Sequence, residues 1–289
     1  MPQGAPQASG RHRVSETVAA GGSGPADLGG PAAGGWPAPA PGAAPLAQMI
    51  TAQAGLELRT LARNGEQLLL TLIIPVLLLV GFSLEPLVKV GSGPRVDFLV
   101  PGIIALAVMS TAFTSQAIAT GFERRYGVLK RLGATPLSRA GLIAAKTLTV
   151  LSVELVQAVV ILGVGLALGW RPTASPPATA WVVLLLLAGT AAFSGLALLM
   201  AGTLRPEATL AAANLVYLVL LGLGGVIFPL TRFPAGAQPV LRLLPSGALS
   251  DGLHSVLQHG GGLPLRDLAV LAAWAVLGIG LAARLFRWE

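Results

Sequence analysis

Residues 178–204 read ATAWVVLLLLAGTAAFSGLALLMAGTL, a stretch without a single charged side chain. An α-helix needs about 20 consecutive apolar residues to cross the hydrocarbon core of a bilayer, and this stretch is long enough. Five further apolar stretches lie at 67–84, 98–121, 141–169, 208–230 and 268–286. The sequence therefore predicts an all-α membrane protein with six transmembrane helices.

The composition of the whole chain agrees with this fold class. Of its 289 residues 54% are hydrophobic and only 11% are charged, with a mean hydropathy of +0.75. A soluble domain carries about one quarter charged residues, so an ordinary soluble protein is excluded. The net charge of +7 does not indicate a nucleic-acid partner, because membrane proteins collect Lys and Arg in cytoplasmic loops. The absence of cysteine excludes a thiolate metal site and a cysteine nucleophile.

The chain before the first span falls into two parts. Residues 1–45 are rich in Gly, Ala and Pro and predict a disordered tail without a signal peptide. Residues 46–289 form the predicted membrane domain. Within it, residues 46–64 have apolar positions at helical spacing, with Arg59 and Arg63 on another side. This pattern predicts an interfacial helix on the membrane surface, and the alternative is a plain first turn leading into the membrane.

The distribution of basic residues predicts the orientation. If the first span enters from the cytoplasm, the inside segments carry the larger share of Lys and Arg. By the positive-inside rule, both termini are then cytoplasmic.

The loop after the second span, GFERRYGVLKRLGATPLSR at 121–139, is charged and amphipathic in a chain that otherwise avoids charge. One side of a helix here would hold Tyr126, Val128, Leu129 and Leu132, and the other Glu123, Arg124, Lys130 and Arg131. Arg125 falls among the apolar positions, and Gly133 and Pro136 end the helix. Such a helix can dock into a groove of another protein, or it can be a basic loop of no special role. The spacing alone leaves both open.

The segment between the fifth and sixth spans is too long for a tight turn and too apolar for a solvated loop. Prolines at 234, 239 and 245 interrupt it, which predicts short re-entrant helices at the extracellular side. Ser246 and His254 raise the alternative of an intramembrane hydrolase. Their spacing does not favour it, and His254 and His259 are not placed as a helical metal pair.

Glu154 lies near the middle of the third span, and Gln157 follows one turn later on the same side. An ionisable group at this depth is costly and should face protein or water. Glu154, Gln157 and Asn214 in the fifth span are the candidates for the substrate route. Alternatively, Glu154 forms a structural hydrogen bond to Asn214 between the helices. None of the three lysines stands in a phosphate-binding loop, so the chain is not predicted to hydrolyse ATP itself.

Four segments of the chain resemble a known family in the same order: LRTLARN, FLVPGIIALAVMS, FERRYGVLKRLGATPLSRAGLIAAK and LLPSGALSDGLHSVL. They are similar to the ABC-2 type permeases, which are the membrane subunits of type V ABC exporters. The third segment is similar to drug and antibiotic efflux permeases of actinobacteria. His254 departs from the arginine that the family often has.

The resemblance implies partners and roles for several residues. It implies a connecting helix with Arg59 and Arg63, re-entrant helices at 239–258, and export across the plasma membrane. It implies a second permease copy or a related permease, a small hydrophobic substrate, and a separate ATP-binding subunit that holds ATP and Mg²⁺. The coupling helix that docks this subunit would span 123–132 and use Glu123, Arg124, Arg125, Tyr126, Leu129, Lys130 and Arg131. An ion-coupled transporter that uses Glu154 and a non-transporting scaffold remain the alternatives.

Overall fold

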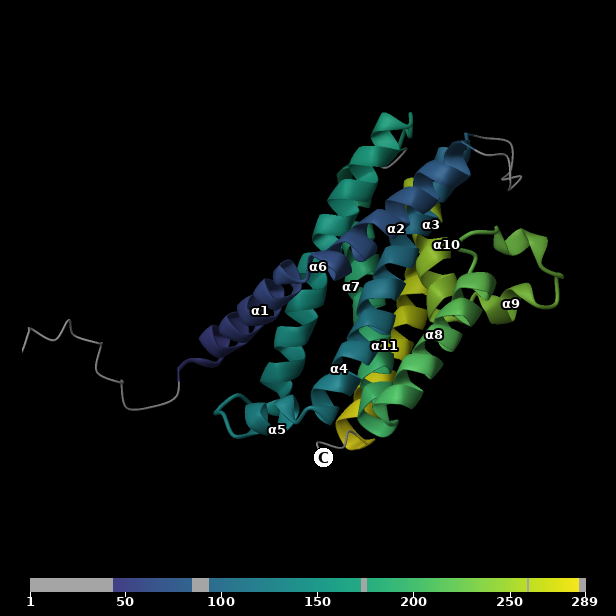
Figure 1. The fold of residues 1–289 in the computed structure, drawn as a ribbon. Coiled ribbons are helices and arrows are strands. Elements are labelled where there is room, and N and C mark those ends of the chain that lie inside the picture. Colours follow the sequence, from purple (N-terminus) through teal and green to yellow (C-terminus); the bar gives the residue numbers. More distant parts are fainter. Residues whose placement is uncertain (1–43, 85–93, 173–175, 259, 286–289) are drawn as a thin grey trace, which may run out of the picture. The chain divides into compact units, whose positions relative to one another are not determined.

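The computed structural model describes residues 44–84, 94–172, 176–258 and 260–285 (Figure 1). These residues are helical, as the sequence predicts, and contain no strand. The tail predicted for residues 1–45 lies outside the described residues except for its last two positions.

The helices follow one another through short connections. The first half of the chain contains α1 (Leu46–Arg63), α2 (Gly65–Leu84), α3 (Arg95–Val108), the π-helical segment η1 (Met109–Ser115), α4 (Gln116–Arg125), α5 (Val128–Gly133) and α6 (Arg139–Ala167). The second half contains α7 (Pro176–Thr203), α8 (Pro206–Leu223), the 3₁₀ turn η2 (Leu230–Arg232), α9 (Gln238–Leu241), α10 (Pro245–Leu257) and α11 (Leu265–Leu285).

Five of these helical stretches are long and apolar enough to cross a membrane. They are Arg95–Arg125, Ala140–Ala167, Ala178–Thr203, Pro206–Leu223 and Leu265–Leu285. The first of the six predicted spans, 67–84, falls on α2, whose apolar part Thr71–Leu84 is shorter. The chain is therefore a multi-pass helical membrane protein with five candidate spans in its described part.

The stretch Arg95–Arg125 is the central element of the fold. It joins α3, η1 and α4 into one helical run, and 89% of its most apolar window is buried. Pro101 lies inside α3 without ending it, and the π-helical segment follows about two turns later. The hydropathy pattern predicts the span but not the π-helical segment within it.

The most extensive helix pair within the described residues is α7 with α11. A Cβ atom at Gly195 would lie 2.8 Å from the backbone nitrogen of Ile279, and one at Gly278 would lie 2.9 Å from the carbonyl carbon of Gly195. Small residues at a helix crossing let two backbones approach, which is a common way to pack helices in membranes. This contact ties the last span to the middle of the chain.

The predicted span 208–230 is too long at its end. Helix α8 stops at Leu223, and Gly225 adopts a left-handed conformation with φ of +69°. At the neighbouring Gly224, an added Cβ would meet the Ser246 side chain of α10. The predicted span extends too far because the residues after Leu223 are still apolar. The helix nevertheless ends there, and the backbone turns and packs against α10.

Candidate functional site

The segment predicted as one coupling helix, residues 123–132, is divided in the structure. Helix α4 ends at Arg125, and Gly127 takes a left-handed conformation with φ of +69°. The Tyr126 and Gly127 amides donate to the carbonyl oxygens of Phe122 and Arg124, at 2.9 and 3.1 Å, and so close the helix end. A separate short helix, α5, begins at Val128. Because glycine reaches this conformation without strain, Gly127 sets the break.

This break separates the side chains that the sequence placed on one apolar face. Leu129 is 1% exposed and packs inside this chain, whereas Tyr126 is 66% exposed. The Tyr126 ring stacks on Phe122 with 6.2 Å between ring centroids. Lys130 and Arg131 are both exposed on α5. The exposed side chains of this segment thus include Tyr126, Lys130 and Arg131, whereas Leu129 is buried in the subunit.

Arg124 and Arg125 contact the chain itself. The Arg124 guanidinium donates to the carbonyl oxygen of Leu204 at the end of α7. Arg125 forms an ion pair with Glu207 in the first turn of α8. These two bonds hold the end of α4 against the α7–α8 connection.

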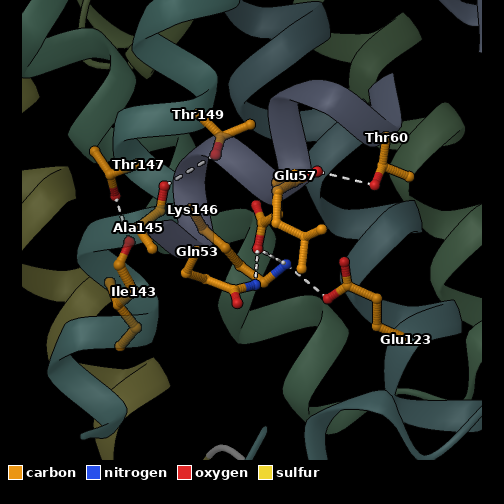
Figure 2. A network of polar contacts seen from close by, with 10 residues as sticks. Gln53, Glu57, Thr60, Glu123, Ile143, Ala145, Lys146, Thr147 and Thr149 are labelled. Carbon is orange, nitrogen blue, oxygen red and sulfur yellow. Dashed lines mark hydrogen bonds and ion pairs between the residues drawn. The ribbon is translucent and has the colours of Figure 1, made fainter. Parts of the chain in front are cut away.

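A buried charge network lies above this segment, on three helices (Figure 2). The Nζ atom of Lys146 on α6 is 2.6 Å from Glu123 on α4 and 3.5 Å from Glu57 on α1. Its side chain is only 6% exposed. Gln53 donates to Glu57 at 3.0 Å. A buried lysine requires such partners, so the network fixes α1, α4 and α6 against one another.

The sequence pattern does not predict this network, although Glu123 belongs to the predicted coupling helix. Lys146 lies within the predicted span 141–169, and an ionisable residue inside a span is a signal for a functional or structural site. That signal was available for Lys146 in the same way as for Glu154.

Arg59 and Arg63 lie on α1, and both are exposed. Helix α1 packs against α6, with Ala54 buried at the contact side. The helix predicted at 46–64 is thus present as α1, which ends at Arg63.

The candidates Glu154, Gln157 and Asn214 have different hydrogen-bond partners. Glu154 accepts a hydrogen bond of 2.5 Å from Thr190 on α7. Gln157 accepts from Thr111 on η1 and donates to the Thr71 carbonyl oxygen on α2, both at 3.0 Å. Asn214 is exposed and donates to Leu210 within α8. The bond suggested between Glu154 and Asn214 is therefore wrong, because α7 supplies the partner of Glu154.

Helix α10 contains the residues considered for hydrolysis. The His254 Nε2 atom is 2.9 Å from the Phe98 carbonyl oxygen, and Nδ1 is 2.6 Å from that of Ser250. Within the described part of the chain, the Ser246 hydroxyl has no hydrogen-bond partner. His254 thus joins α10 to α3, and a Ser246–His254 pair is not formed. In the same part of the chain no group of three or more His, Cys, Asp or Glu residues could hold a metal ion.

Comparison with known proteins gives two findings. Residues 94–284 match the family model described as ABC-2 family transporter protein. The chain is also 28% identical over 215 residues to the "Probable doxorubicin resistance ABC transporter permease protein DrrC" of Mycobacterium tuberculosis, in strains CDC 1551 / Oshkosh and ATCC 25618 / H37Rv. That alignment covers 71% of this chain and 76% of the mycobacterial protein.

Proposed function

This chain belongs to the ABC-2 family of transporter proteins, and from that premise we propose that it is the membrane subunit of an ATP-driven exporter. A separate ATP-binding subunit binds ATP and Mg²⁺, and this chain supplies no ATPase site. The cargo is a hydrophobic or amphipathic small molecule. The mycobacterial relative is named for doxorubicin resistance, which supports a drug-like cargo for this chain as well.

The proposed topology completes the five candidate spans with a sixth, α2, in the plasma membrane. Both termini are cytoplasmic, and α1 lies on the inner membrane surface with Arg59 and Arg63 toward the headgroups. Helices α9 and α10 are re-entrant from the outside. The basic side chains of α5 and of the α4 end support this orientation, because Lys and Arg favour the cytoplasmic side.

The observation that carries the proposal is the docking surface, which we define as Tyr126, Lys130 and Arg131. It follows directly on Arg95–Arg125, the most buried of the candidate spans. An aromatic side chain flanked by exposed charge is a common anchor in protein interfaces. Movement of a bound ATP-binding subunit would thus act on the central helix of the permease and switch the route from inward to outward facing.

The route itself runs between this chain and a second permease. Asn214 is the candidate that faces outward from the subunit, since its side chain is exposed on α8. Glu154 and Gln157 are buried and bonded to neighbouring helices, which supports a role in holding the wall of the route. Polar bonds of this kind join helices inside the bilayer.

Asn214→Leu should lower export about tenfold, the effect of one lost hydrogen bond to the cargo. The variant keeps the branched shape of the side chain, and it should retain the ATP-binding subunit. Export from inverted vesicles measures the effect, with Asn214→Gln as the matched control that keeps an amide. Unchanged export of every tested cargo by Asn214→Leu would remove Asn214 from the route.

Affinity purification from the native membrane in mild detergent tests the proposed function as a whole. We expect mass spectrometry to find an ATP-binding subunit with the permease and the complex to hydrolyse ATP. If the chain purifies without a partner after chemical cross-linking, and transport continues without ATP, the exporter proposal is replaced by an ion-coupled transporter that uses Glu154. If there is no transport at all, the scaffold alternative takes its place.

A further inference from the structure

A cavity of about 420 Å³ lies among α1, η1, α4, α5 and α6, beside the buried charge network. Its volume is in the range of pockets that take drug-sized ligands.

Two buried polar side chains on α4 line this cavity without a protein partner. Gln116 is 6% exposed and Thr120 is 1% exposed. Among the described residues, no hydrogen-bond partner is present for the amide nitrogen or oxygen of Gln116. The hydroxyl group of Thr120 has none either. Buried polar groups are nearly always paired, so these two side chains indicate a hydrogen-bonding molecule in the cavity.

The charge of the lining indicates the sign of that molecule. Its ionisable residues are Glu57, Glu123 and Lys146, one positive charge against two negative ones, which leaves a net charge of −1. Lys146 is already bonded to both carboxylates. Two carboxylates with one basic partner favour a cation in this partly sheltered site, because charges interact more strongly beside protein than in bulk water.

The remaining walls indicate the rest of the ligand. Leu56, Leu132, Val150 and Val153 supply apolar surface from three helices. Thr111 and Ser115 of the π-helical segment complete one side, and π-helical turns occur often at functional sites. An apolar body with one positive charge and at least one hydrogen-bonding group matches this lining.

We propose that this cavity binds an amphipathic organic cation within a single permease subunit. The charged group of the ligand lies near Glu57 and Glu123, its polar group bonds Gln116 and Thr120, and its apolar body contacts Leu56 and Val150. The site goes beyond the proposed export function and needs neither the ATP-binding subunit nor a second copy. It adjoins α5, so a bound ligand would contact the helix that carries part of the docking surface.

The test is binding of rhodamine 6G, a lipophilic monocation, to the full chain in nanodiscs without the ATP-binding subunit. Fluorescence anisotropy gives the affinity after subtraction of empty nanodiscs. We expect Gln116→Leu and Glu57→Gln each to weaken binding at least about tenfold. Glu207→Gln removes an exposed carboxylate outside the cavity and should bind as the original chain does. The anion fluorescein should bind at least about tenfold more weakly than rhodamine 6G.

The possible outcomes separate this proposal from the proposed function. Original affinity in both Gln116→Leu and Glu57→Gln, or equal binding of fluorescein, would overturn the cavity as a cation site even if an ATP-binding subunit co-purifies. Loss of binding in both variants would support the site even if no such subunit is found. If Gln116→Leu does not yield folded protein, Thr120→Val replaces it, and its unchanged affinity would overturn the proposal equally.

Discussion

The triple variant Tyr126→Ala, Lys130→Glu and Arg131→Glu should abolish ATPase stimulation while the permease stays folded in the membrane. Loss of an aromatic anchor at an interface costs about 2 kcal/mol or more, and like charges brought together cost several kcal/mol. The combined loss weakens docking by about a thousandfold or more, since each 1.4 kcal/mol is a factor of ten. All three side chains are exposed in this chain, so the fold should tolerate the changes.

The measurement is ATP hydrolysis by the ATP-binding subunit with each permease variant in nanodiscs. Arg171→Glu with Arg266→Glu is the matched control, because it reverses two exposed arginines away from the docking surface. The control should leave stimulation unchanged. Stimulation at the original level by the triple variant would place the docking site elsewhere. Leu129→Ala belongs in a separate experiment, because Leu129 is buried and its loss would disturb the subunit itself.

The helices were predictable because hydropathy alone decides which segments enter a membrane. The start of α6 also had a local signal, since Ser138 caps it by accepting from the Gly141 amide at 3.1 Å. The break at Gly127 was not predicted, because a glycine inside an amphipathic pattern can continue a helix or end it. Only its left-handed conformation in the folded chain decides between the two.

The candidate site was predictable in its residue types and less so in its pairings. The charged loop at 121–139 was found because its composition differs from the rest of the chain. The partners of Glu154 and Lys146 come from helices far apart in sequence, and no local spacing encodes them. Such pairings follow from how the helices pack. These spans are apolar on nearly every side, so their sequence does not indicate which side contacts which neighbour.

Lys146→Met should destabilise the permease by about 3 kcal/mol, the lower end of the cost of breaking a buried ion pair. The substitution keeps the length of the side chain and leaves Glu57 and Glu123 facing each other without their shared cation. Both carboxylates are partly exposed, at 18% and 27%, so water relieves some of the cost. Unfolding in denaturant, followed by circular dichroism, measures the effect.

Adding Glu57→Gln and Glu123→Gln to Lys146→Met should restore most of the lost stability. The three neutral side chains leave no uncompensated charge, and replacing a buried ion pair by neutral groups is often tolerated. Glu207→Gln added to Lys146→Met is the matched control. It should restore no stability, because Glu207 on α8 pairs with Arg125 and not with Lys146. Equal stability of Lys146→Met and the original chain would show that packing of α1 on α6, and not the charge network, holds these helices together. If stability recovers in the neutral triple variant and not in the control, unpaired charge is the cause of the loss. The change in packing caused by Lys146→Met is the same in the two variants.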